Sequence, residues 1–150
     1  HRSRRYQHPF ALLFLDVDHF KEINDRHGHV FGDHVLLHVV QLARGIIRPP
    51  DIMGRYGGEE FVIGLVECYQ SGALQIAERI RLKIAQEQFT WEHHSTVVTV
   101  SIGVVMLSPE IDQVETLVTR ADQAMYYAKH RGRNRVELYS EACASENQLG

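Results

Sequence analysis

The sequence predicts one α/β domain of the α+β kind, in which a mixed central sheet contains one antiparallel hairpin and carries helices on its outside. Short apolar, β-prone runs alternate with segments whose apolar residues recur at helical spacing. Helices separate most strands, but the two strands that flank Gly57 and Gly58 are joined by a tight turn. A chain of 150 residues with 44% hydrophobic content can bury one good core, and no Pro/Gly/Ser-rich linker divides it.

Each predicted element has its own signal. The apolar run 10–17 is too short for a membrane span and ends in carboxylates, as is typical of a buried central strand. Segment 72–88 has core residues at near-helical spacing. Segment 96–107 is almost entirely β-branched, and Gly103 within it indicates a bulge or close packing. In chain order we expect a strand over 10–17, helices over 19–27 and 32–47, a hairpin over 52–66, a helix over 72–88, a strand over 96–107, a helix over 112–131 and a strand over 135–139.

Composition and charge narrow the function. The formal net charge of -3 gives no reason to expect a surface for a nucleic acid polymer. Cys68 and Cys143 lack metal-ligand spacing, so we expect reduced thiols in a cytoplasmic protein rather than a disulfide. We expect no signal peptide and no direct membrane insertion of this domain, because no apolar run is long enough to span a membrane.

The chain lacks an initiator Met and opens on His-Arg-Ser-Arg-Arg-Tyr. We therefore expect a single catalytic domain over 1–150, with its core at about 8–140, excised from a longer signalling protein that can itself be membrane-attached. A processed or tagged start is the alternative. The polar residues 140–150 are expected to form a frayed tail.

Carboxylates occur where adjoining strands would bring them together. Asp16 ends the first strand, and Glu59 and Glu60 follow the glycine pair of the hairpin. Such a group repels itself unless cations neutralise it, and hard oxygen ligands favour Mg²⁺ or Mn²⁺ over zinc. The pattern predicts a metal site, with a plain solvated turn as the alternative. For Asp18, the alternative to a site role is the N-cap of the next helix.

Four segments, in order and at the expected spacing, resemble the successive motifs of the GGDEF family of diguanylate cyclases over about residues 8–140. They read LDVDHFKEINDRHGHVFGD (15–33), RYGGEEF (55–61), VSIGV (100–104) and ADQAMYYAKHRGRN (121–134). Glu59 stands where the family name has Asp, which is the GGEEF variant and keeps the carboxylate. No motif position has lost its chemistry.

The resemblance implies a palm-like fold, shared with adenylyl cyclases and many polymerases, and a nucleotidyl transfer activity. Two GTP molecules would be condensed into cyclic di-GMP and pyrophosphate by attack of a 3′-hydroxyl on an α-phosphate. Each domain would bind one GTP, so catalysis would need a homodimer. Two alternatives stay open: a catalytically silent module that acts as a GTP or cyclic di-GMP receptor, and a cyclase with a mononucleotide product.

The resemblance also implies which residues would bind the metal ion, Mg²⁺ or Mn²⁺. Asp16 and Glu59 would bind through their side chains and Val17 through its backbone carbonyl. Glu60 would be a further ligand or a base, although Glu59 is the family's usual candidate for the proton acceptor.

For guanine, the family's positions match the carboxamide of Asn24 and the carboxylate of Asp33, with His29 as an additional nucleotide contact. Gly57 and Gly58 would let the substrate approach the backbone closely. The alternatives are a helix-end role for Asn24 and, for Asp33, the N-cap of a helix beginning near His34.

Cations are expected around the triphosphate. Lys21, Lys129 and Arg133 match the family's phosphate-contacting positions, and we take Arg131 and Arg135 as solvated neighbours. As an alternative, the basic cluster only complements the dipole of the helix that ends there.

A second nucleotide site is expected just before the hairpin. Arg48 and Asp51, with two prolines between them, resemble the family's inhibitory site for the product cyclic di-GMP, and Arg79 matches its secondary contact. Arg can contact guanine or phosphate through its planar fork. The alternative is a rigid connector into the hairpin.

Overall fold

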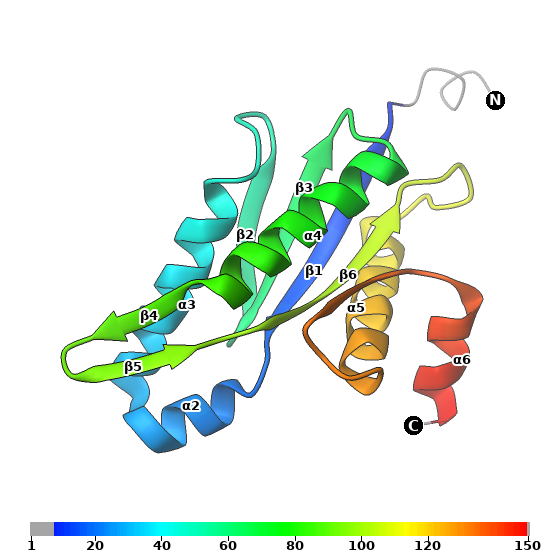
Figure 1. Cartoon of the computed structure of the whole chain (residues 1–150). Coiled ribbons are helices and arrows are strands. Elements are labelled where there is room, and N and C mark those ends of the chain that lie inside the picture. Colours follow the sequence, from blue (N-terminus) through cyan, green and yellow to red (C-terminus); the bar gives the residue numbers. More distant parts are fainter. Residues whose placement is uncertain (1–7, 150) are drawn as a thin grey trace.

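In the computed structural model, which describes residues 8–149 and their side chains as far as residue 145, a five-stranded sheet forms the middle of the molecule (Figure 1). The strand order is β2-β3-β1-β6-β7; β6 and β7 are parallel, and the other neighbours are antiparallel. The predicted mixed sheet with an antiparallel hairpin is therefore confirmed. The strands are β1 (Phe10–Val17), β2 (Ile52–Gly57), β3 (Glu60–Val66), β6 (Val100–Met106) and β7 (Arg135–Leu138).

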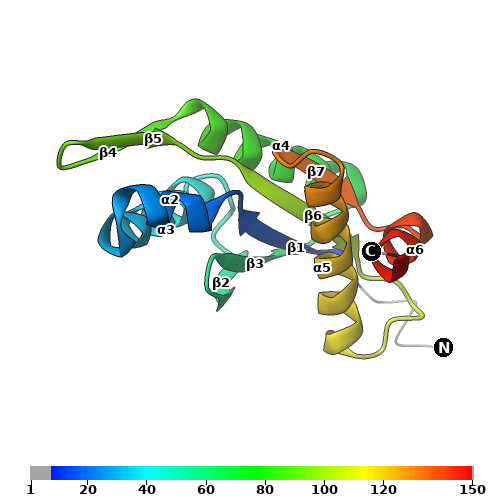
Figure 2. The same ribbon diagram turned by 90° about the horizontal axis from the view of Figure 1, so that it is seen from below.

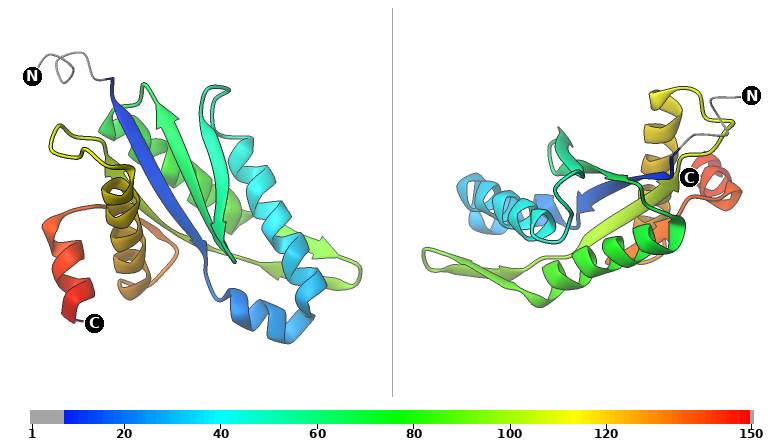
Figure 3. Two further views of the ribbon diagram at one scale, coloured as in Figure 1. Left: turned by 180° about the vertical axis from the view of Figure 1, so that it is seen from behind. Right: turned by 90° about the horizontal axis from the view of Figure 1, so that it is seen from above.

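Helices cover both faces of this sheet, with α4 and α5 on opposite sides (Figure 3). Helix α2 leads from β1 into α3, which packs on the same face as α4. Helix α6 lies beside α5 (Figure 1). The helices are α2 (Phe20–His27), α3 (His29–Arg44), α4 (Gln70–Gln86), α5 (Val114–His130) and α6 (Glu141–Leu149).

Strand β1 separates two cores because its side chains alternate between the faces. Leu13 and Leu15 join the core under α3 and α4, whereas Leu12 and Phe14 join the core under α5. Full burial of one such side chain contributes about 1.5–3 kcal/mol. Asp16 continues the second series, so its carboxylate faces α5.

Gly103 on β6 lets α5 pack closely against the sheet, as the sequence predicted. A Cβ atom there would lie 2.2 Å from the carbonyl oxygen of Ala121 and from the backbone nitrogen of Met125. Any side chain would push α5 away, and with it the site residues that α5 carries.

Several predicted boundaries were wrong. Helix α4, expected over 72–88, is Gln70–Gln86, and α3 ends at Arg44 rather than 47. Helix α3 begins at His29 rather than 32, because Gly28 has a φ of 93° and turns the chain directly from α2 into α3. The strand expected over 96–107 is two strands: β6, which begins at Val100, and β5 (His94–Val97).

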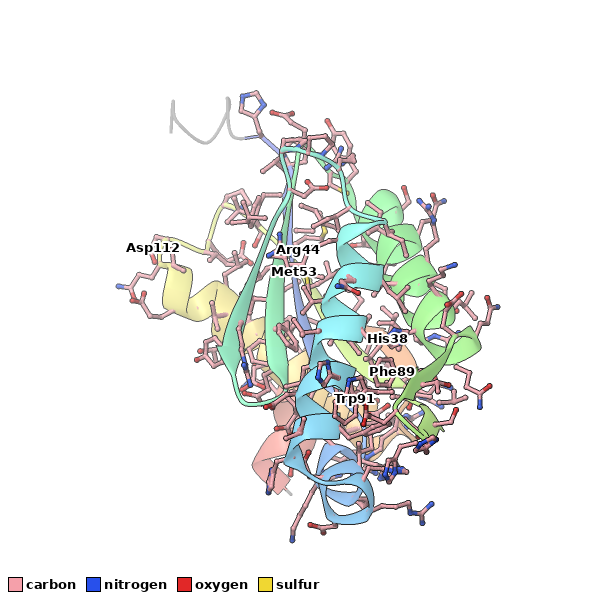
Figure 4. All side chains as sticks on the ribbon, turned by 90° about the vertical axis from the view of Figure 1, so that its left-hand side faces the viewer. His38, Arg44, Met53, Phe89, Trp91 and Asp112 are labelled. Carbon is pink, nitrogen blue, oxygen red and sulfur yellow. The ribbon has the colours of Figure 1, made fainter. Side chains whose placement is uncertain are left out.

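Strand β5 pairs with β4 (Gln88–Trp91) in a hairpin that projects beyond the main sheet (Figure 2). The hairpin packs on α3 through aromatic contacts. The rings of His34 and Trp91 stack with centroids 4.5 Å apart, and those of His38 and Phe89 are 4.9 Å apart (Figure 4).

The expected frayed tail is also wrong, because the described part of the C-terminal segment forms α6. Cys143 on α6 is fully buried and its thiol points to the carbonyl oxygen of Leu138 at 3.7 Å, which fixes this helix to the end of β7. Cys143 and Cys68 are both buried and unpaired. Among the residues described, no helix combines the length and the apolar character needed to cross a membrane.

Candidate active site

The pairing of β1 with β3 brings the predicted acids to one end of the sheet. Asp16 lies directly opposite Glu60 in the antiparallel register. The backbone N–H of Val17 donates to the carbonyl of Glu59 at 3.2 Å, which ties the tip of the hairpin to the end of β1. The structure therefore brings together all four residues predicted for the metal site.

Asp16 is buried, and among the described residues only one of its two carboxylate oxygens has a partner. Its side chain is 7% exposed, and Oδ2 lies 3.1 Å from Nζ of Lys129 on α5. Its Oδ1 is buried and has no hydrogen-bond partner among the described residues. Burial raises the pKa of Asp16 to about 6; Lys129 opposes this shift, and the charges of Glu59 and Glu60 add to it.

Acidic side chains outnumber basic ones around Asp16. Burial raises the pKa of Glu60, the charges of Asp122 and Glu59 raise it further, and Lys129 lowers it. Asp122 was not selected from the sequence, although it precedes Lys129 by two turns on α5 and so shares its side of the helix. Buried acids that raise one another's pKa are stabilised by a cation.

These donors suit a hard divalent cation, which prefers oxygen ligands. The described part of the chain contains no cluster of three or more His, Cys, Asp or Glu side chains arranged to hold a metal ion. Asp16, Val17, Glu59 and Glu60 nevertheless lie at the same end of β1 and β3.

The hairpin turn differs from its prediction. Gly57 is the last residue of β2 and pairs with Glu60, so the turn consists of Gly58 and Glu59. Neither glycine has a positive φ; a register shift between Arg55 and Gly57 bends the strand instead. A Cβ on Gly58 would meet nothing within 4 Å, and one on Gly57 would meet only Oε1 of Glu60 at 3.5 Å. Open space above the two glycines fits the close approach of a ligand.

Asn24 and Asp33 come from the two helices that follow β1. The side chain of Asn24 packs against α3 at Gly32, where a Cβ atom would lie 1.8 Å from its Oδ1. That Oδ1 is buried and has no hydrogen-bond partner among the described residues. Asp33 is exposed within α3, so the N-cap interpretation of Asp33 is wrong.

Asp33 lines a cavity of about 340 Å³ between α3 and the β2–β3 hairpin. Apolar side chains and Arg55 form the rest of the wall: Leu36, Leu37, Val40, Arg55 and Phe61. His29 lies one turn before Asp33 on the same side of α3, but it lines a separate cavity of about 380 Å³ with His27, Trp91 and His94.

The predicted phosphate-binding cations come from two elements. Lys21 is exposed on α2, and its side chain makes no hydrogen bond or ion pair with any residue in the described part of the chain. Lys129 is in the last turn of α5, and Arg133 is exposed in the turn that follows. Arg135 is not simply solvated, since it is half-buried on β7 and lies 3.6 Å from Glu137.

Asp18 does not cap a helix. The N-cap position of α2 is His19, with a φ of 58° and no side-chain cap. Asp18 is 2% exposed and accepts hydrogen bonds from Thr99, Ser101 and the backbone N–H of Asn134. These donors are 81, 83 and 116 residues away in the sequence, so no local pattern could reveal them.

Arg48 and Asp51 form a closed pair at the other end of the hairpin strands. Arg48 donates to Asp51 from Nε and Nη2, at 3.0 and 2.9 Å, and also to the carbonyl of Val66. The side chain of Asp51 is fully buried, whereas that of Arg48 is 42% exposed. Arg79 is exposed on α4, and its side chain makes no hydrogen bond or ion pair with a described residue.

Known proteins resemble this chain in both sequence and fold. A family model described as "Diguanylate cyclase, GGDEF domain" matches residues 1–135. The chain is 40% identical over 128 residues to Diguanylate cyclase A of Treponema denticola, covering 85% of this chain and 34% of that protein. It is 42% identical over 132 residues to Diguanylate cyclase DosC of Escherichia coli, covering 87% of this chain and 28% of that protein. The chain thus spans about a third of these relatives.

Solved structures of GGDEF and GGEEF domains are similar to this chain in fold. The active GGEEF domain of a diguanylate cyclase from Vibrio cholerae has a TM-score of 0.84 at 35% identity, covering 93% of this chain and 88% of that one. The GGDEF domain of DgcB from Caulobacter crescentus, in complex with c-di-GMP, has a TM-score of 0.85 at 31% identity, covering 91% of this chain and 81% of that one.

Proposed function

This chain belongs to the GGDEF family of diguanylate cyclases, and we propose on that premise that it condenses two molecules of GTP into cyclic di-GMP and pyrophosphate. The observation that carries the proposal is the buried carboxylate of Asp16, whose Oδ1 has no hydrogen-bond partner among the described residues. It lies where the two acids of the hairpin and Lys129 meet. A receptor has no need for such a costly group.

The side chains of Asp16 and Glu59 and the carbonyl of Val17 would hold Mg²⁺ or Mn²⁺, with Glu60 as a further ligand. Metal ions bound there would offset the negative charge that develops on the phosphoryl oxygens and lower the pKa of the attacking hydroxyl. Until they bind, the ammonium of Lys129 is the ion-pair partner of Asp16 among the described residues.

In the proposed reaction, a bond forms between the 3′-oxygen of one GTP and the α-phosphorus of the other, and the bond to pyrophosphate breaks. The reciprocal attack by the second 3′-hydroxyl closes the ring and releases a second pyrophosphate. The proton of the 3′-hydroxyl passes to a carboxylate at the hairpin, Glu59 or Glu60. The raised pKa of Glu60, caused by burial and by Asp122 and Glu59, suits a proton acceptor better than an ordinary surface glutamate would.

Guanine would be selected by Asn24 and Asp33. The amide of Asn24 and the carboxylate of Asp33 supply the donor and the acceptors that the guanine edge requires. The cavity beside Asp33 has apolar walls suited to a planar base. Gly57 and Gly58 leave open space for the sugar and phosphates, and His29 would contact the nucleotide from the start of α3.

The triphosphate would be bound by Lys21, Lys129 and Arg133, whose positive charges come from α2 and from the end of α5. Since each domain would hold one GTP, the two half-sites must face each other in a homodimer for attack to occur. The reaction uses GTP, so we expect the domain to work in the cytoplasm.

Product inhibition would act through Arg48 and Asp51, with Arg79 assisting. Arg48 keeps a partly exposed guanidinium while its partner carboxylate is buried, so a ligand would approach Arg48 first. Cyclic di-GMP inhibits only if it binds an unproductive arrangement of two domains better than the productive one.

The test is incubation of the chain with GTP and Mg²⁺, with forced dimerisation, followed by mass analysis of the product. Cyclic di-GMP supports the proposal. Unchanged GTP that is nevertheless bound would indicate a silent receptor, and a cyclic mononucleotide would indicate a different cyclase.

A further inference from the structure

The turn between α5 and β7 has a backbone that its sequence does not favour. Gly132, Arg133 and Asn134 have φ angles of 124°, 63° and 48°. Part of this follows from the end of α5, where the N–H of Arg133 donates to the carbonyl of Ala128 at 3.0 Å around Gly132. That helix ending requires a positive φ at Gly132 alone. For Arg133, the left-handed conformation is unfavourable and must be imposed by its surroundings.

Two side chains from distant elements hold Asn134. The carboxylate of Asp18, just after β1, accepts its backbone N–H at 3.0 Å. The guanidinium of Arg81, on α4, donates to its Oδ1 at 2.8 Å and to its carbonyl oxygen at 3.4 Å. Asn134 is therefore restrained through its backbone and its side chain at once.

The two restraining groups are themselves fixed. Both carboxylate oxygens of Asp18 accept hydroxyl hydrogen bonds at 2.7 Å, one from Ser101 and one from Thr99. The side chain of Arg81 is 15% exposed, and its Nε donates to Glu78 at 2.9 Å. Groups held in this way can define the position of a neighbouring side chain, because they lose little freedom when it binds a ligand.

The restraint determines where Arg133 lies, since Arg133 directly precedes Asn134. The charge of Arg133 lies near α2: the pKa of Glu22 is lowered chiefly by its hydrogen bond with His19, and Arg133 adds to that shift. The turn also follows directly on the end of α5, where Nζ of Lys129 lies 3.1 Å from Oδ2 of Asp16 at the proposed metal site. Arg133 therefore lies next to the end of α5 and near α2, the two elements that carry the other proposed phosphate contacts, Lys129 and Lys21.

We propose that Asp18 and Arg81 are positioning residues that hold the 131–134 turn so that Arg133 can contact the triphosphate of GTP. The inference rests on the proposed function, because it takes Arg133 as a phosphate contact. Neither Asp18 nor Arg81 would touch the nucleotide. Each would act through Asn134, and their loss would weaken binding of phosphates without changing recognition of the base.

The experiment measures the affinity of wild type and variants for a non-hydrolysable GTP analogue by calorimetry, and for guanosine by NMR titration. Arg81→Met, Asp18→Asn and Arg133→Ala should each weaken binding of the analogue by about tenfold, as expected for loss of a hydrogen bond to a charged group. Guanosine should bind each of them as it binds wild type. Arg81→Met tests the inference even if the buried Asp18→Asn change prevents folding.

A double-mutant cycle separates positioning from simple stabilisation. Because Arg81 acts through Arg133, adding Arg81→Met to Arg133→Ala should cause no further loss of affinity. Arg120→Met is the matched control, since Arg120 also pairs with a glutamate, Glu110 at 3.5 Å, and should leave binding unchanged.

Two results would overturn the inference alone: wild-type affinity for the analogue in Arg81→Met while Arg133→Ala binds weakly, or a full additional loss in the double variant. Unchanged affinity in Arg133→Ala would overturn the phosphate contact in the proposed function, and this inference with it.

Discussion

Two buried aspartates at opposite ends of the β1–β3 pair are satisfied in opposite ways. Asp51 accepts four hydrogen bonds, three from Arg48 and one from the N–H of Val66, at 2.9 to 3.1 Å. Asp16 has one cationic partner, Lys129, and one oxygen without a hydrogen-bond partner among the described residues. The carboxylate pKa values diverge accordingly.

Burial raises the pKa of both groups. For Asp51 the hydrogen bonds from Arg48 and Val66 outweigh burial and leave the pKa below its ordinary value. For Asp16 burial prevails and the pKa rises to about 6. A carboxylate satisfied inside the fold holds the structure together, whereas one left unsatisfied stabilises the fold only when a cation arrives from solution. The comparison therefore separates a closed ion pair from an open ligand site.

The largest effect expected from this contrast is on catalysis. Glu59→Gln removes a charge at the open end of the sheet and should lower cyclase activity by at least about a hundredfold, the scale of losing a group that stabilises the transition state. The domain should stay folded, because Glu59 is only half-buried. Initial rates at saturating Mg²⁺, with dimerisation forced, provide the measurement.

Glu115→Gln is the control for that experiment, since Glu115 is exposed in the first turn of α5. Near-normal turnover of Glu59→Gln would show that Glu59 is not part of the metal site.

A smaller effect is expected on base selection at the same end of the sheet. Asp33→Ala should weaken GTP binding by about tenfold or more, because polar groups of guanine would lose a charged partner. Affinity for the metal should change less, and ATP should bind the unaltered chain more weakly than GTP. Calorimetry with Asp25→Ala, an exposed neighbour on α2, checks this; equal binding of ATP and GTP by wild type would refute the role of Asp33.

At the closed end, Arg48→Ala should leave the initial rate nearly intact and raise the cyclic di-GMP concentration needed for inhibition by about tenfold, the scale of one charge-assisted contact. It should also lower the free energy of unfolding, because Asp51 loses the two hydrogen bonds that come from the Arg48 side chain and keeps the two from backbone N–H groups. The pKa of Asp51 is lowered in the fold, so this loss should be present above pH 4 and should fade as the pH falls below it.

Arg44→Ala is the matched control: Arg44 is on α3, and among the described residues its side chain donates one long hydrogen bond, 3.4 Å to the carbonyl of Met53 (Figure 4). Identical inhibition curves for wild type and Arg48→Ala would leave Arg48 and Asp51 as a rigid connector into the hairpin.

The same contrast explains what the sequence could predict. Strand β1 matches the predicted 10–17 because an apolar run that ends in Asp16 is a strong local signal. The hairpin is also visible locally. Strands β4 and β5 were missed as a pair because each has four residues and they lie outside the main sheet. Their stability comes from stacking on α3, which local patterns do not show.

For the site, residue types indicated where acidic and basic side chains gather, but not how many hydrogen-bond partners each side chain has. Asp18 has the sequence signature of a helix cap and yet is bound by three donors from distant segments. Arg48 and Asp51 were predicted together, but the full burial of the Asp51 side chain follows from the position of β3. Whether a buried charged group has hydrogen-bond or ion-pair partners depends on tertiary contacts, so only the fold determines it.

The most direct test of the open carboxylate is the stability of Asp16→Asn relative to wild type in EDTA, measured by chemical unfolding from pH 4 to pH 8. With a folded pKa of about 6, native Asp16 keeps a proton that the unfolded chain releases near pH 4, so wild type loses stability as the pH rises through this window. Asp16→Asn lacks that loss. We expect Asp16→Asn to be more stable than wild type by about 1–3 kcal/mol at pH 8, with little difference at pH 4. A variant less stable than wild type at pH 8 would show that Asp16 is satisfied within the fold and contradict the account.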